Sequence, residues 1–148
     1  MYLNIKWQKR FMRLAQTIAT WSKDTSTQVG TVIVDHKKRI VSVGYNGMPP
    51  GVNDDVKERH ERPAKYFYFE HSERNAVYNT DQSLEGCTAF VTHFPCADCA
   101  RALIKKGLSY VVVDVDYGLN SEFTRTRKDS AMAAFEMFNE SGVIVVEI

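Results

Sequence analysis

The sequence has little cysteine, almost no net charge and no long apolar run. Three cysteines among 148 residues are too few, and odd in number, for a fold held together by disulfides. Lysine and arginine number 19 against 18 aspartates and glutamates, so the basic excess of a typical nucleic-acid-binding protein is missing. No apolar stretch is long enough to span a bilayer. These absences favour a globular protein whose partner is a small molecule, and neither a nucleic acid nor a membrane.

The chain also lacks internal repeats, low-complexity tracts and linker-like segments. Because 148 residues is an ordinary length for one domain, we expect a single domain over residues 1–148. The first residues lack the basic region, apolar run and small-residue cleavage site of a secretory signal. A cytoplasmic location is therefore expected.

In the first half of the chain, apolar periodicity predicts a helix followed by a hairpin. Apolar residues recur at spacings of three and four between about residues 6 and 22, which predicts one helix. The β-rich runs 28–34 and 39–45, joined by a short polar connection, predict an antiparallel hairpin. Residues 46–70 hold three prolines, two glycines and many charges, and predict a long active-site flap.

The second half alternates helix and strand. The pattern predicts helices from residue 72, at 96–106 and at about 121–139, and strands at 88–92, 110–115 and 143–148. Helices that alternate with apolar strands indicate crossover connections and a largely parallel region. Together with the hairpin, this predicts an α/β fold, a three-layer α/β/α sandwich with a mixed five-stranded sheet.

Two short motifs have the residue types of a catalytic zinc site. His71 and Glu73 form a His-x-Glu motif, and Cys96 and Cys99 follow Pro95 in a Pro-Cys-x-x-Cys motif. One imidazole and two thiolates give tetrahedral Zn²⁺ three ligands and leave its fourth position open for water. Residues three apart share a helix face, so both sulfurs can approach one ion. This pair of motifs is the signature of the zinc-dependent nucleobase deaminases.

Glu73 is predicted to be the general acid and base of this site. A carboxylate beside the open position can take a proton from water and return it to a cytosine ring nitrogen and to the departing amine, which turns cytosine into uracil. The alternative is a closed structural site, in which His93, Asp98 or Cys87 supplies a fourth ligand and Glu73 has no function.

With both motifs in place, the chain resembles the deoxycytidylate (dCMP) deaminases of the zinc-dependent cytidine deaminase superfamily. The resemblance covers nearly the whole length and is most specific in the run Gly44-Tyr45-Asn46-Gly47-Met48-Pro49. Residues 26–30, 70–76 and 94–96 add to it. It implies hydrolysis of dCMP to dUMP and ammonia, with one catalytic Zn²⁺ per chain held by His71, Cys96 and Cys99.

The resemblance also implies roles in substrate binding. Asn46 matches an asparagine that contacts the sugar, but an asparagine here is equally suited to close a turn with Gly47. Tyr117 matches a tyrosine that packs against the base, and the alternative is ordinary packing at a strand end. The family directs the backbone amide at position 72 towards the base. Ser72 stands where the family usually has alanine, so its hydroxyl bears on which cytosine is accepted.

Regulation and assembly are implied in the same way. The family's regulated members are activated by dCTP and inhibited by dTTP at a second site, which here would use Tyr45, Asn46 and Gly47, with Mg²⁺ accompanying the triphosphate. A homo-oligomer, a hexamer or a dimer, is expected. Candidate phosphate-binding cations are Lys23, Arg74, Arg125, Arg127 and Lys128.

Two other activities remain as alternatives to a dCMP deaminase. One is a bifunctional dCMP/dCTP deaminase, which would share every motif described. The other is a nucleic-acid deaminase of the tRNA-adenosine type, which shares the zinc motifs but needs a basic binding face. A net charge of +1 and the run from Gly44 count against the second.

Overall fold

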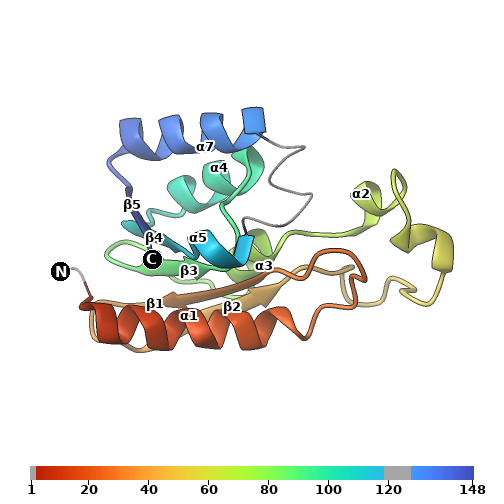
Figure 1. The fold of residues 1–148 in the computed structure, drawn as a ribbon, viewed down its shortest axis with the longest axis horizontal. Helices are drawn as coiled ribbons and strands as arrows, with labels where there is room; N and C mark the ends of the chain where they lie inside the picture. The colour runs from red at the N-terminus through yellow and green to blue at the C-terminus, as the bar shows by residue number, and fades with distance from the viewer. Residues whose placement is uncertain (1–2, 119–127) are drawn as a thin grey trace.

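A mixed five-stranded sheet between two layers of helices forms the centre of the molecule (Figure 1). The computed structural model describes residues 3–118 and 128–148. The strand order is β2-β1-β3-β4-β5. The strands are β1 Gly30–Val34, β2 Ile40–Tyr45, β3 Thr88–Val91, β4 Tyr110–Val113 and β5 Ile144–Glu147. The predicted sandwich with a mixed five-stranded sheet is confirmed.

Strand pairing changes from antiparallel to parallel across the sheet. β1 pairs antiparallel with both β2 and β3, whereas the β3–β4 and β4–β5 pairs are parallel. The predicted hairpin and the parallel region after it are therefore both present. All five residues of β1 are buried, because this strand has a neighbour on each side and helices over both faces.

Helix α1 (Ile5–Ala19) covers one face of the sheet. Asn4 is its N-cap residue, and the Asn4 side chain accepts a hydrogen bond from the Trp7 backbone N–H at 3.2 Å. Its inner face packs on alternate residues of the strands. The buried residues of this contact are Leu3, Phe11, Met12, Ala15, Ile18, Val32, Val34, Phe90 and Val112.

The predicted helix over residues 6–22 is wrong at its C-terminal end, since α1 stops at Ala19. Beyond it, the Ser22 hydroxyl donates to the Asn46 carbonyl at 2.7 Å. Trp21 has the spacing of the helix stripe, but its ring lies edge-on to Tyr45. A long-range contact to the end of the hairpin therefore replaces the last helical turn.

The opposite face of the sheet is covered by α3 (Ser72–Tyr78), α4 (Ala97–Lys105) and α7 (Lys128–Ser141). These helices contribute Ala76, Leu103 and Phe138, among others, to a second apolar core. The start predicted for the last helix, residue 121, lies outside the described residues. None of the helices within residues 3–118 and 128–148 has the length and apolar character needed to cross a membrane.

The predicted strand boundaries agree with the structure to within two residues. The strand predicted for 110–115 ends at Val113. Val115 instead begins the short helix α5 (Val115–Gly118). Its first turn is stabilised by Asp114, whose side chain accepts hydrogen bonds from the backbone N–H groups of Asp116 and Tyr117 at 3.1 and 3.0 Å.

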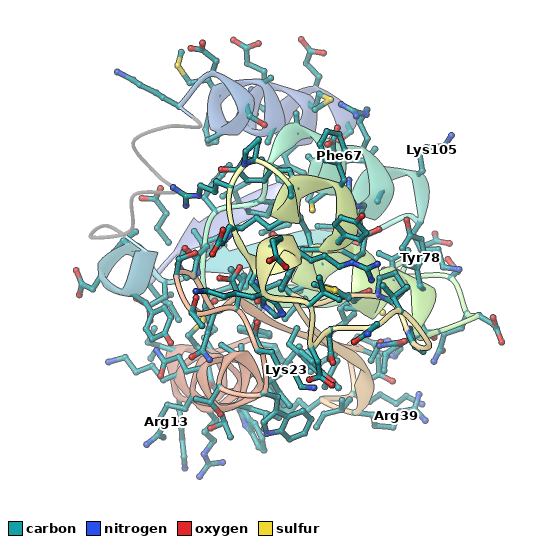
Figure 2. All side chains as sticks on the ribbon, turned by 90° about the vertical axis from the view of Figure 1, so that its right-hand side faces the viewer. Arg13, Lys23, Arg39, Phe67, Tyr78 and Lys105 are labelled. Carbon is teal, nitrogen blue, oxygen red and sulfur yellow. The ribbon has the colours of Figure 1, made fainter. Side chains whose placement is uncertain are left out.

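Residues 46–70, called the flap below, leave β2 and return at the start of α3. The flap contains the short helices η1 (Lys57–His60) and α2 (Lys65–Tyr68) and extends away from the sheet on the right of Figure 1. Its two ends are joined because Gly47 and Glu70 exchange backbone hydrogen bonds of 3.1 and 2.8 Å. Figure 2 faces this side of the molecule, where Phe67 of α2 is 86% exposed.

Candidate metal centre and active-site cleft

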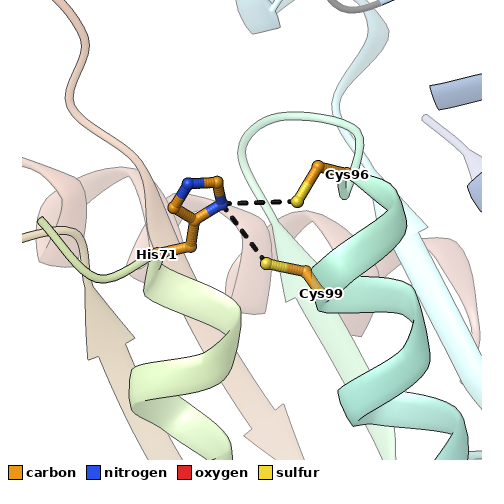
Figure 3. A group of neighbouring side chains, drawn as sticks. All are labelled: His71, Cys96 and Cys99. Carbon is orange, nitrogen blue, oxygen red and sulfur yellow. Dashed lines mark hydrogen bonds between the residues drawn. The ribbon is translucent and has the colours of Figure 1, made fainter. Parts of the chain in front are cut away.

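Three side chains of metal-ligand type converge where α3 and α4 begin (Figure 3). His71 is the N-cap residue of α3 and Cys96 is the N-cap residue of α4. His71 Nδ1 lies 3.4 Å from the Sγ of Cys96 and 3.4 Å from the Sγ of Cys99. The helix predicted from residue 96 begins one residue later, so Cys96 approaches the cluster from extended backbone and Cys99 from the first turn.

The donor set of this cluster fits Zn²⁺. Two sulfurs and one imidazole are typical zinc ligands, and the three ligand atoms all lie within 4.8 Å of one another. A hydrogen bond from Cys99 lowers the pKa of Cys96 to about 4, and His71 adds to this effect. The same contact, together with burial, raises the pKa of Cys99. Of the two thiols, that of Cys96 therefore loses its proton readily, and a bound dication would favour loss of the proton of Cys99 as well.

The closed-site alternative needs a fourth protein ligand. Among residues 3–118 and 128–148, no fourth histidine, cysteine or carboxylate belongs to the cluster. Cys87 is buried in the apolar core, and Asp98 pairs with Arg101. His93 packs edge-on against Tyr117, with 5.7 Å between ring centroids. The geometry is therefore that of a three-ligand site.

Glu73 is the second residue of α3 and lies beside the cluster. It is 4% exposed, and its Oε2 is 3.5 Å from Cys99 Sγ and 3.2 Å from Ser72 Oγ. Burial raises the pKa of Glu73, because removal from water disfavours the charged carboxylate. A raised pKa suits a group that must both accept and release a proton near neutral pH.

A residue of α7 supports the cysteine-bearing turn. Cys96 occupies the N-cap position of α4, but its side chain makes no capping hydrogen bond. The backbone N–H of the next residue, Ala97, donates to the Ser130 hydroxyl at 2.8 Å. One of the N–H groups left without a helical partner at the start of α4 is satisfied in this way.

Two adjoining pockets lead to Glu73. The deep pocket, about 60 Å³, is lined by residues that include Asn46, Ser72, Glu73 and His93. The outer pocket, about 560 Å³ and more open, is lined by residues 22–28, His93 and Tyr117. Because His93 and two further residues line both, the pockets are parts of one cleft whose inner end is the general acid and base candidate.

The structure places the predicted substrate-binding residues at different depths of this cleft. Asn46 lines the deep pocket, and its amide is also bonded to the chain: Oδ1 accepts from Val29 N–H at 2.8 Å and Nδ2 donates to the Thr27 carbonyl at 2.9 Å. Ser72 lines the deep pocket too. Tyr117 lines only the outer pocket of the two, where its ring meets His93.

The residues predicted for an effector site and for phosphate binding are spread more widely. Tyr45 and Gly47 lie outside the lining of both pockets, with Tyr45 against Trp21. Lys23 pairs with Asp54 at 2.7 Å. The other described cations are Arg74, which pairs with Glu70 and Asp98, and Lys128, which is exposed on α7. Arg125 and Arg127 lie outside the described residues.

Sequence reasoning assigned no function to four charged residues of the deep pocket, namely Asp24, Arg62, Lys65 and Glu70. Asp24 and Lys65 form an ion pair in the pocket wall. Asp24 lies in the segment before β1, and nothing local distinguishes Lys65 from the other charged residues of the flap. Their 41-residue separation hides the pairing from any local pattern.

Comparison with known proteins finds a family model and curated relatives that match most of the chain. Residues 5–115 match the family model of the cytidine and deoxycytidylate deaminase zinc-binding region. The chain is 43% identical over 140 residues to an uncharacterized deaminase in the luxG 3′ region of Aliivibrio fischeri, covering 95% of the chain and 92% of that relative. It is 37% identical over 145 residues to the deoxycytidylate deaminase of Homo sapiens, covering 94% of the chain and 78% of that enzyme.

A solved structure has the same fold. The dCMP deaminase from the cyanophage S-TIM5, in complex with dCMP and dUMP, superposes with a TM-score of 0.77 at 22% identity, covering 99% of this chain and 100% of that one. The mixed sheet with helices on both faces is therefore the architecture of a dCMP deaminase structure.

Proposed function

Because the chain belongs to the cytidine and deoxycytidylate deaminase family, we propose that it catalyses the zinc-dependent hydrolysis of dCMP to dUMP and ammonia. The observation that carries this proposal is the His71, Cys96 and Cys99 cluster with buried Glu73 beside it at the inner end of a cleft. The similarity to deoxycytidylate deaminases over most of the chain supports dCMP as the substrate.

In this proposal His71, Cys96 and Cys99 hold the zinc ion. When bound, Zn²⁺ acts as a Lewis acid that makes water a nucleophile at neutral pH. Glu73 accepts a proton as the water oxygen forms its bond to C4 of cytosine, and it passes that proton to ring N3. The second water proton reaches the exocyclic amine as the C4–N bond breaks. The atoms balance: C4 gains the oxygen, and ammonia leaves.

The cleft residues would orient the nucleotide. We propose that Asn46 contacts the deoxyribose through the second lone pair of Oδ1, which can accept a hydrogen bond from a sugar hydroxyl. The first lone pair accepts from the Val29 N–H, and Nδ2 already donates to the Thr27 carbonyl and to Asp24 Oδ2. The backbone N–H of Ser72 contacts the base, and Tyr117 packs against the nucleotide in the outer pocket. The shared lining of the two pockets supports a ligand that extends from Glu73 towards Tyr117.

Regulation is a further part of the proposal. We propose that dCTP activates and dTTP inhibits through Tyr45, Asn46 and Gly47, with Mg²⁺ bound to the triphosphate, in a cytoplasmic homo-oligomer that is a hexamer or a dimer. The position of Asn46 supports this, because it lines the deep pocket while its neighbour Gly47 bonds to the end of the flap. A ligand at this turn would therefore reach both the flap and the substrate pocket.

Ammonia release from dCMP, dCTP, deoxycytidine, CMP and tRNA, each with and without added dCTP or dTTP, tests the function. We expect turnover of dCMP above all other substrates. Comparable turnover of dCTP would establish the bifunctional alternative, and tRNA as the only substrate would establish the nucleic-acid deaminase. No turnover of any cytosine nucleotide would overturn the proposal, whereas a missing effector response would overturn only its regulatory part.

A further inference from the structure

Two buried hydroxyl groups connect an interior strand of the sheet to Glu73. Thr31 lies in β1, and its Oγ1 is 2.8 Å from the Oγ of Ser72 at the start of α3. The Ser72 hydroxyl in turn reaches Oε2 of Glu73 at 3.2 Å. Both Thr31 and Ser72 are 0% exposed, so neither hydroxyl exchanges hydrogen bonds with bulk water.

The chemistry of Thr31, Ser72 and Glu73 determines which group donates in each of the two hydrogen bonds. An ionised carboxylate only accepts hydrogen bonds, and each hydroxyl has a single hydrogen to donate. When Glu73 is ionised, Ser72 therefore gives its hydrogen to Oε2, and Thr31 gives its own to Ser72. β1 is paired with a strand on each side, so the position of Thr31, the first donor, is fixed.

The Ser72 hydroxyl is the nearer of two side-chain contacts to Oε2 of Glu73. The Ser72 oxygen lies 3.2 Å from Oε2, whereas the Cys99 sulfur lies 3.5 Å from it. The hydroxyl of Ser72 is therefore the contact that can hold the carboxylate in place.

We propose that Thr31 and Ser72 are positioning residues, a hydrogen-bond relay that holds the Glu73 carboxylate in the orientation used for proton transfer. The proposal rests on the acid–base role of Glu73 described above. The relay depends on the hydroxyl of Ser72, which an alanine at this position would lack. Its effect falls on the proton-transfer steps and not on nucleotide affinity.

Steady-state kinetics of the zinc-loaded protein with dCMP provide the first test. Ser72→Ala and the isosteric Thr31→Val are each expected to lower kcat about tenfold, the effect of one hydrogen bond to a charged group, with KM changed less than about twofold. Thr31→Ser restores the hydroxyl and with it the kcat. The double variant is expected to be no slower than Ser72→Ala alone, because both changes break one relay.

Crystal structures of the zinc-loaded wild type and Ser72→Ala protein give a readout besides activity. We expect one Glu73 rotamer in the wild type and more than one in the variant, at equal zinc content. An unchanged kcat with a single rotamer would overturn the relay, as would additive effects of the two changes or an effect on KM alone. If Ser72→Ala does not fold, the comparison of kcat between Thr31→Val and Thr31→Ser tests the relay. Absence of dCMP turnover by the wild type would refute the proposed function separately, and the rotamer comparison would still test the relay.

Discussion

Lys65 of the flap and Asp24 before β1 form a buried ion pair in the wall of the deep pocket, with 3.0 Å between Nζ and Oδ2. Their side chains are only 8% and 6% exposed. Burial by itself raises the pKa of Asp24, but hydrogen bonds from the Ser26 backbone and from Lys65 outweigh it and lower the pKa overall. The pair ties the flap to the segment that leads into the sheet and so sets the shape of the pocket.

Lys65→Met should therefore weaken the whole fold. The change leaves the Asp24 carboxylate buried without its cation, and we expect the free energy of unfolding to fall by about 3 kcal/mol. Urea denaturation measures the loss. Lys57→Met, an exposed lysine of the same flap, is the matched control and should change the stability by less than about 0.5 kcal/mol. Equal stabilities of the two variants would contradict the structural role of the pair.

Sequence reasoning succeeded where the determinants are local and failed where they are not. His71 and Glu73, and likewise Cys96 and Cys99, could be identified because each motif lies within four consecutive residues and has the residue types of a catalytic zinc site. The Asp24–Lys65 pair could not, because it joins segments 41 residues apart that show no common pattern. The end of α1 was misjudged for the same reason.

Asn46 shows how one residue can satisfy two interpretations. The sequence left open a sugar contact and a turn-closing asparagine. The structure has the amide bonded to the chain segment 27–29 and also lining the deep pocket, which is compatible with both. A single amide has enough donors and acceptors for this, so sequence alone could not choose between the two.

Glu73→Gln should remove activity while the metal centre stays intact. An amide cannot take or return a proton at neutral pH, so kcat for dCMP is expected to fall about 10³-fold. Zinc content, measured by elemental analysis, should remain near one ion per chain, because Glu73 is outside the ligand cluster. Glu85→Gln, at an exposed position, serves as the control and should keep wild-type turnover. Full turnover by Glu73→Gln would refute the catalytic assignment.

The two buried cysteines Cys99 and Cys87 should differ in their effect on zinc binding. Cys99→Ala deletes a ligand of the cluster and is expected to lower the zinc content well below one ion per chain. Cys87→Ala makes the same substitution in the apolar core, outside the cluster. This variant should bind zinc like the wild type and lose about 1 kcal/mol in the free energy of unfolding. Zinc retention by the Cys99 variant would show that the ion does not depend on this cluster.

His93 should make the stability depend on pH between about pH 6.5 and pH 4. Burial lowers its pKa to about 4, partly offset by the charge of Asp114. Between these pH values the imidazole of His93 is protonated in the unfolded chain but neutral in the folded chain. The free energy of unfolding therefore has its full value above pH 6.5 and falls as the pH decreases. The loss from pH 7.5 to pH 5 is about 2 kcal/mol. His93→Asn removes this term, so denaturation curves at the two pH values should show a smaller drop in the variant; an equal drop would be inconsistent with a neutral buried His93.

Gly30 is expected to be irreplaceable for steric reasons. A Cβ there would lie 2.0 Å from the Ala15 carbonyl oxygen of α1, so Gly30→Ala must push the helix away from β1. We expect a loss of at least about 3 kcal/mol in the free energy of unfolding. Gly47→Ala is the control, since the nearest atom to its Cβ would be in the Tyr45 ring at 3.9 Å. Similar thermal unfolding temperatures for both variants would contradict the close approach of α1 to β1.

The hydrogen bond from the Ala97 N–H to Ser130 extends the metal centre beyond the segment that defines the family. The family match ends at residue 115, whereas Ser130 lies on the helix after it. Cys96 is at the position where a capping side chain would normally stand, and as a ligand it is committed to the metal. The sulfur ligands therefore come from the start of α4, whereas α7 supplies a hydrogen bond to the backbone of that turn. A substitution at Ser130 would therefore act on the backbone of the cysteine-bearing turn while leaving all three ligand side chains in place.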